Sequence, residues 1–270
     1  LLIIVCEALF LCFVGKNIYA GSIPKADKPN IIIVLTDDQG YGDIGRHGHP
    51  LLTTPNIDRM YDESVRFENF YVSPSCSPTR AALMTGMHEF RNGVTHTIAP
   101  REHLNRDAII LPQLLKTVGY HTGFIGKWHL GDGKGYSPGD RGFDFSSTTV
   151  RGNQAEFDPE IIRNGVITKH EGFREDIYFN EAMTFIEECG DEPFFCYLAT
   201  YSPHTPLVAP EKNIAPYRKD TDEETATYLG EVDNIDDNLG RLLDFLEDKK
   251  LDKNTIVIFM NDNGETMGLD

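Results

Sequence analysis

Short hydrophobic runs alternate with amphipathic stretches along most of the chain. Residues 31–36 (IIIVLT), 120–125, 194–200 and 255–260 (TIVIFM) are rich in β-branched or aromatic side chains. Runs of this kind are typical of strands that are buried on both faces of a parallel sheet. We therefore predict strands at these four places and another near residues 65–72.

Between the predicted strands the apolar spacing becomes helical. The longest predicted helix starts near Thr221, and shorter ones are predicted near residues 55–64, 78–87, 109–118 and 175–188. Apolar residues three or four positions apart give the long helix one buried stripe: Tyr228, Val232, Ile235, Leu239, Leu242 and Leu246. Within residues 161–168, an Asn-Gly pair favours a type I′ turn and predicts a hairpin. Strands that alternate with helices predict an α/β fold, a mostly parallel sheet with helices on both faces.

The N-terminal segment has a different character. Residues 1–15 (LLIIVCEALFLCFVG) are apolar apart from Glu7, and Ala20 suits the position before a cleavage site. The run is short for a membrane span and suits the hydrophobic region of a secretory signal, with a buried core segment as the alternative. We predict a signal peptide over residues 1–20 and an exported protein, which is periplasmic, secreted or lumenal, with no stable membrane span after signal removal. Residues 21–270 would then remain after cleavage.

Charge narrows the choice of partners. The formal net charge is −17, and the sequence contains no basic stripe that could neutralise nucleic-acid phosphates. We therefore expect no nucleic-acid partner. A small anionic substrate remains compatible, because a local basic pocket or a metal ion can outweigh a distant surface charge.

Acidic and amide side chains follow two of the predicted strands. Asp37 and Asp38 come after residues 31–36, and Asp262 and Asn263 come after residues 255–260. Adjacent carboxylates repel each other unless a cation lies between them, and oxygen ligands favour Ca²⁺ or Mg²⁺. Asx turns and helix caps are the alternative for each pair taken alone. Two such pairs at two strand ends predict a divalent metal site.

Basic and imidazole side chains follow the other two strands. Lys127 and His129 lie in GKWHLG, and His204 lies in YSPHTP between two prolines that restrict the local backbone. A histidine in a loop is commonly an ordinary surface residue. In open α/β sheets, however, the site lies beyond the carboxyl ends of the strands, so these side chains are candidates for the same edge as the metal.

Cys76 stands apart from the other cysteines. Cys6 and Cys12 fall in the predicted signal, and Cys189 and Cys196 could form a disulfide but are better explained as small buried hydrophobes. Cys76 comes just before a predicted helix, and Arg80 follows within a turn. Helix-end N–H groups and a guanidinium would bind an anion there, and a reactive thiolate is one possibility. We expect this segment to be exposed.

The segment CSPTRAALMTG closely resembles the signature of the formylglycine-dependent sulfatases, Cys-x-Pro-x-Arg followed by a short helix and Thr-Gly. Further pieces resemble the family in family order, from residue 29 to residue 264: PNIIIVLTDDQGYGD, GYHTGFIGKWHLG, RGFDFS, SPHTP and NDNG. The resemblance implies an alkaline-phosphatase-like sulfatase fold. It also implies a smaller C-terminal subdomain and a second lysine further along. Residues 21–270 therefore resemble the N-terminal part of a sulfatase catalytic domain, and the chain resembles an N-terminal fragment of such a protein.

The resemblance also implies roles for individual residues. Cys76 would be oxidised to formylglycine by a maturation enzyme that reads Pro78 and Arg80, and Arg80 would later steady the hydrated aldehyde. Calcium would be bound by the modified Cys76 together with four oxygen ligands: Asp37, Asp38, Asp262 and Asn263. Lys127 and His204 would hold the sulfate oxygens and assist the leaving group. His129 would take a proton from the hydrate.

The implied substrate is a sulfate monoester, either a sulfated carbohydrate or an aryl sulfate. A phosphomonoester or phosphonate hydrolase of the same superfamily is one alternative, and a non-catalytic calcium-binding remnant is another. Residues 91–101 and 146–154 are candidates for lining the substrate pocket, with His96 and Arg151 as possible contacts.

Overall fold

A computed structural model describes residues 28–150 and 155–265 of the chain. The predicted signal peptide and Arg151 lie outside the described residues. Among the helices of the described part, none is long and apolar enough to cross a membrane.

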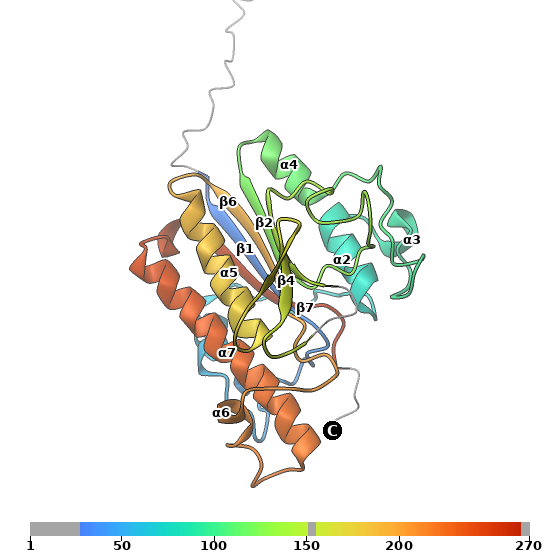
Figure 1. Ribbon diagram of the computed structural model, residues 1–270. Helices are drawn as coiled ribbons and strands as arrows, with labels where there is room; N and C mark the ends of the chain where they lie inside the picture. The colour runs from blue at the N-terminus through green and yellow to red at the C-terminus, as the bar shows by residue number, and fades with distance from the viewer. Residues whose placement is uncertain (1–27, 151–154, 266–270) are drawn as a thin grey trace, which may run out of the picture.

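The centre of the molecule is a seven-stranded sheet in the order β5-β4-β3-β2-β6-β1-β7 (Figure 1). Five neighbouring strands run parallel to one another: β3 (Phe145–Thr149), β2 (His121–Gly126), β6 (Phe194–Ala199), β1 (Asn30–Thr36) and β7 (Thr255–Asn261). A hairpin of β4 (Glu160–Arg163) and β5 (Val166–Lys169) adds to the sheet antiparallel to β3. The mostly parallel sheet predicted from the sequence is confirmed.

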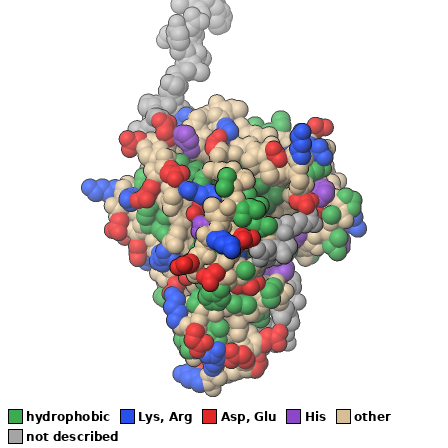
Figure 2. Space-filling view, in the orientation of Figure 1, with side chains coloured by type: hydrophobic (Ala, Val, Ile, Leu, Met, Phe, Trp, Pro, Cys, Tyr) green, Lys and Arg blue, Asp and Glu red, His purple; other side chains and the backbone are tan. Residues whose placement is uncertain are grey.

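Helices cover both faces of the sheet because its strands bury side chains on both sides. Ile32 and Val34 of β1 pack with α1 (Pro55–Glu63), α5 (Arg174–Cys189) and α7 (Glu223–Asp248). Their neighbours Ile33 and Leu35 face the other way, toward α2 (Cys76–Thr85) and α4 (Leu111–Thr117). The short elements are η2 (Gly45–His47), α3 (Glu89–Asn92), α6 (Glu211–Ile214) and η3 (Asp252–Asn254). Figure 2 shows acidic and basic side chains interspersed over the face that carries α5 and α7, rather than a continuous basic stripe.

Most predicted elements form within a few residues of their expected bounds. The Asn164-Gly165 turn joins β4 to β5 with positive φ angles of 49° and 83° at its two residues, as a type I′ turn requires. Cys189 and Cys196 are buried free thiols, which agrees with the favoured interpretation rather than with a disulfide. Strand β3 follows the RGFD segment and was not among the predicted strands.

The strand predicted near residues 65–72 is wrong. This segment is described, but it is neither strand nor helix, and Val65, Phe67 and Tyr71 are largely exposed. The segment has a composition that favours a strand, but a strand needs a neighbour to pair with its backbone N–H and C=O groups. Residues 65–72 pair with none of the strands in the described ranges.

Candidate active site

The loops that follow four adjacent parallel strands meet at one edge of the sheet. Backbone hydrogen bonds extend the strand pairing past the strand ends, from Asp262 N to Thr36 O (3.1 Å), from Lys127 N to Ala199 O (2.8 Å) and from Asp37 N to Ser202 O (3.3 Å). The strand order β2-β6-β1-β7 therefore brings residues of four distant sequence segments together. The edge is the one at which ligands bind in open α/β sheets.

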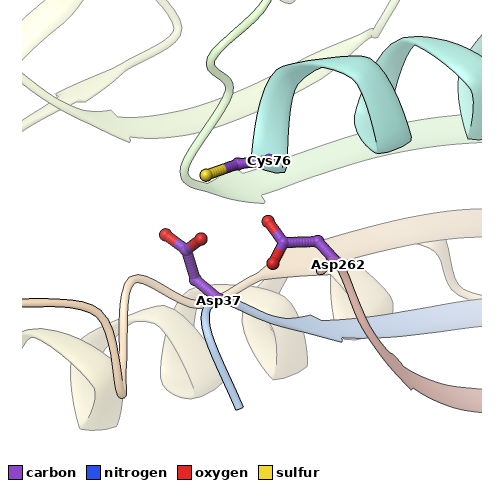
Figure 3. Close-up of side chains that lie close together, drawn as sticks. All are labelled: Asp37, Cys76 and Asp262. Carbon is purple, nitrogen blue, oxygen red and sulfur yellow. The ribbon is translucent and has the colours of Figure 1, made fainter. Parts of the chain in front are cut away.

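Cys76, Asp37 and Asp262 form the centre of this edge. Cys76 is the first residue of α2 and faces the two aspartates, which follow β1 and β7 (Figure 3). One ligand atom from each of the three residues lies within 4.8 Å of the others, and all three residues are buried. The arrangement places a thiol at the positive end of a helix and above two carboxylates.

Two cations balance the buried carboxylates. The Arg80 guanidinium donates to Asp262, and Lys127 Nζ donates to Asp37 and lies 3.8 Å from Cys76 Sγ. Burial alone would raise the pKa of Asp37, but the positive charges of Lys127 and Arg80 hold it below the ordinary value. Asp37 is therefore a carboxylate at neutral pH.

Two buried oxygens at this edge, Asp37 Oδ1 and Asn263 Oδ1, accept no hydrogen bond from the described residues, although Asp37 Oδ1 lies 3.6 Å from Arg80 Nη2. Leaving such atoms unpaired is costly, and a hard cation would satisfy both. Asp38 lies outside the cluster around Cys76, although its Oδ1 accepts a hydrogen bond of 2.6 Å from Asn263 Nδ2. These oxygen ligands fit a divalent site around Asp37 and Asp262, and Asp38 adjoins it through Asn263.

The two predicted histidines contact different residues. His204 Nε2 is 3.7 Å from Asp38 Oδ2, and its side chain is partly exposed. His129 is more enclosed, and its Nε2 lies 3.1 Å from Thr97 O and 3.3 Å from Glu102 Oε2. Burial, with the positive charges of Lys127 and Arg80, lowers the pKa of His129 to about 4. His129 is therefore a neutral imidazole at neutral pH.

The state of Cys76 differs from two expectations. Burial and the charge of Asp37 raise the pKa of the Cys76 thiol to about 12, which disfavours a plain reactive thiolate. Cys76, Pro78 and Arg80 are also all buried, so the expectation of an exposed segment is wrong. The α2 helix begins two residues earlier than predicted, and its first turn packs inward against the sheet edge.

Sequence reasoning missed Glu102, which contacts His129 from a loop that has neither hydrophobic period nor motif. His96, a suggested substrate contact, is exposed, and its Nδ1 accepts from Ile98 N of its own loop. The described contacts therefore do not join His96 to the site.

A sequence model of the sulfatase family matches residues 29–269, which is most of the chain. The chain belongs to the sulfatase family. It is 34% identical to human N-acetylgalactosamine-6-sulfatase over 277 residues, which cover 92% of this chain and 52% of that protein. It is 30% identical to mouse arylsulfatase J, over 88% of this chain and 43% of that protein. The chain thus spans about half the length of the curated relatives it matches.

Solved structures of sulfatases share the fold. The structure of Ps i-CgsB in complex with k-i-k-neocarrahexaose superposes with a TM-score of 0.80 and 29% identity, covering 89% of this chain and 61% of that one. The PsFucS1 sulfatase from Pseudoalteromonas sp. gives a TM-score of 0.75 and 26% identity, covering 88% and 56%. The mostly parallel sheet with helices on both faces is therefore the sulfatase fold, alkaline-phosphatase-like in its architecture.

Proposed function

We propose that this sulfatase-family chain carries the catalytic centre of a sulfuric ester hydrolase that acts on sulfate monoesters of carbohydrates or aryl alcohols. The observation that carries the proposal is the position of Cys76 at the start of α2, facing Asp37 and Asp262, with Lys127 within 3.8 Å of its sulfur. Relatives named for sulfated sugars and aryl sulfates support this substrate class.

Two groups would complete the centre. Conversion of Cys76 to formylglycine would supply a hydrated aldehyde, a nucleophile whose second hydroxyl gives the product a way to leave. A divalent cation, Ca²⁺ rather than Mg²⁺, would supply positive charge beside the sulfate oxygens. Its ligands would be the modified Cys76 and the residues Asp37, Asp38, Asp262 and Asn263.

The chain's own residues then have separate tasks. Arg80 and Lys127, held in place by buried carboxylates, would stabilise the negative charge that develops on the sulfate oxygens. His204, whose side chain is partly exposed, would contact the same oxygens and the leaving group. His129 is neutral and can therefore accept a proton, which is the role we assign to it.

The burial of Cys76 has a consequence for its maturation. Pro78 and Arg80, which a converting enzyme would read, are as inaccessible as Cys76 in the folded chain. A formylglycine-generating partner would therefore have to act before this region folds. Export directed by residues 1–20 is part of the same proposal, because it would let conversion take place during translocation.

The test compares two esters. The protein is produced from its complete reading frame together with a formylglycine-generating enzyme, and hydrolysis of an aryl sulfate and of the matching aryl phosphate is measured. Faster sulfate hydrolysis that is absent in Cys76→Ala is expected. Faster phosphate hydrolysis would favour a phosphomonoesterase, and cation binding without turnover of any ester, including a panel of sulfated sugars, would favour a non-catalytic remnant.

A further inference from the structure

We propose that Glu102 is a positioning residue for His129: together with the Thr97 carbonyl it holds the imidazole as the Nε2–H tautomer, so that Nδ1 is the atom that accepts a proton. The inference rests on the proposed function, which makes His129 the proton acceptor. It adds which nitrogen acts and which side chain fixes that choice.

Two acceptor oxygens lie close to one nitrogen of the His129 ring. His129 Nε2 lies 3.1 Å from the carbonyl oxygen of Thr97 and 3.3 Å from Glu102 Oε2. A carbonyl oxygen can only accept a hydrogen bond, so Nε2 has to be the donor. The nearby carboxylate oxygen favours the same assignment, because it too is an acceptor when ionised.

The imidazole ring of His129 carries one proton at neutral pH. Burial, with the charges of Lys127 and Arg80, keeps His129 neutral at neutral pH, so the ring carries a single N–H. If that proton is on Nε2, Nδ1 carries the free lone pair. Nδ1 is buried and makes no hydrogen bond with any residue in the described ranges, so its lone pair is available to a proton donor at the site.

The two acceptors, Thr97 and Glu102, are held by backbone hydrogen bonds of their loop. Thr97 and Glu102 belong to one loop that is closed by hydrogen bonds from Thr95 N to Arg101 O (3.2 Å) and from Leu104 N to Leu130 O (3.2 Å). The second bond ties the loop to the residue that follows His129. Glu102 itself is buried, so its contact with the imidazole is poorly screened by water.

The backbone of His129 has an unusual conformation. Its φ of 54° is in the left-handed region, which is unfavourable for a non-glycine residue and persists only when the surrounding structure holds it. The Leu104–Leu130 hydrogen bond holds the backbone next to His129, and the two acceptors at Nε2 hold its side chain. A general base whose side chain is oriented by a third group is a recurring arrangement in enzymes that use covalent catalysis.

The tautomer can be measured without any turnover. The protein is labelled with ¹⁵N-histidine, and the His129 signals are identified by their loss in His129→Gln. We expect a protonated, pyrrole-like Nε2 and an unprotonated, pyridine-like Nδ1 at neutral pH. A protonated Nδ1 would overturn the inference, whatever the protein hydrolyses.

Kinetics test the contribution of Glu102. Glu102→Ala should lower kcat by about 10- to 100-fold, the loss found when metal-bound histidines lose an orienting partner, and should change KM little. Glu102→Gln keeps a carbonyl oxygen as an acceptor and should recover most of the loss. The matched control is Glu171→Gln, which removes the charge of an exposed glutamate on a different loop; it should keep kcat within about twofold.

The two levels of the account fail separately. If His129→Gln retains full turnover, the role proposed for His129 is wrong, even if the tautomer is as expected. If His129 is required but Glu102→Ala turns over as fast as the wild-type protein, the positioning role of Glu102 is wrong and the proposed function stands. Equal losses in kcat for Glu102→Ala and Glu102→Gln would also contradict the role assigned to the acceptor oxygen.

Discussion

The guanidinium of Arg80 donates two hydrogen bonds to one carboxylate oxygen of Asp262, from Nε at 3.0 Å and from Nη2 at 2.7 Å. Both side chains are fully buried. Arg80 belongs to the helix that begins with Cys76, and Asp262 follows the edge strand β7. The ion pair therefore fixes the distance between the thiol and one of the two carboxylates that face it.

Removing this cation should destabilise the protein strongly. Arg80→Met keeps most of the volume but leaves Asp262 and Asp37 as buried carboxylates with one cation fewer, which costs about 3–5 kcal/mol in comparable buried pairs. Denaturant unfolding measures the loss. The control is Arg46→Met, which breaks an exposed pair with Asp62 and should leave the unfolding midpoint unchanged. A similar small effect for both variants would contradict the structural role of the buried pair.

Binding of the divalent cation should depend on Asp37. Asp37→Asn removes one charge from the pair of facing carboxylates, so the bound cation should be lost and turnover should fall by about 10²–10³-fold, as when a charge-stabilising group is removed. Elemental analysis after dialysis measures the cation, and Asp220→Asn, at an exposed position, is the matched control. An undiminished cation content in Asp37→Asn would show that the assigned ligand set is wrong. Chelation of the wild-type protein, with Cys76 converted to formylglycine, should reproduce the loss of turnover, and added Ca²⁺ should restore it.

Asp236 of α7 should stabilise the start of α1 from a distance in sequence. Its Oδ1 accepts from Ile57 N at 2.7 Å and from Asn56 N at 3.0 Å, whereas the N-cap residue Thr54 makes no capping bond with its side chain. Asp236→Ala leaves these N–H groups without their acceptor and should cost about 1–3 kcal/mol of unfolding free energy. Asp244→Ala, at an exposed position of the same helix, should change the unfolding midpoint little.

The same carboxyl group predicts a pH dependence. Burial raises the pKa of Asp236 from 3.8 to about 6, so the folded protein binds this proton more tightly than the unfolded chain. Its contribution to stability therefore falls as the pH rises from about 4 to about 6. In Asp236→Asn this part of the slope should disappear, which denaturant unfolding at several pH values would detect. Identical slopes in the two proteins would contradict the raised pKa.

That the site residues lie close together could be predicted from the sequence, because they follow strands of a parallel sheet. Strands such as β1 and β7 are recognisable by their continuous apolar runs, and parallel strands place their carboxyl ends at one edge. The polar residues after each run, such as Asp37 and Asp262, were therefore expected to lie near one another. Hydrophobic pattern and parallel topology were sufficient for this part.

Other features depended on contacts that no local pattern encodes. Glu102 and Asp236 act through partners that lie 27 and 179 residues away in the sequence, at the ends of loops and helices. The burial of Cys76 follows from the packing of α2 against the sheet edge, whereas the sequence led us to expect an exposed segment. Residues 65–72 have the composition of a strand, but composition does not supply the neighbour that a strand requires.

The most direct test of the central claim joins the chemistry of Cys76 to turnover. The protein from the complete reading frame is prepared with graded amounts of a formylglycine-generating enzyme, and peptide mass spectrometry measures the fraction of the Cys76 segment that carries the aldehyde. We predict that aryl sulfate hydrolysis per molecule rises in proportion to that fraction and is absent in Cys76→Ala. Full hydrolysis by a preparation in which Cys76 is entirely a thiol would contradict the account.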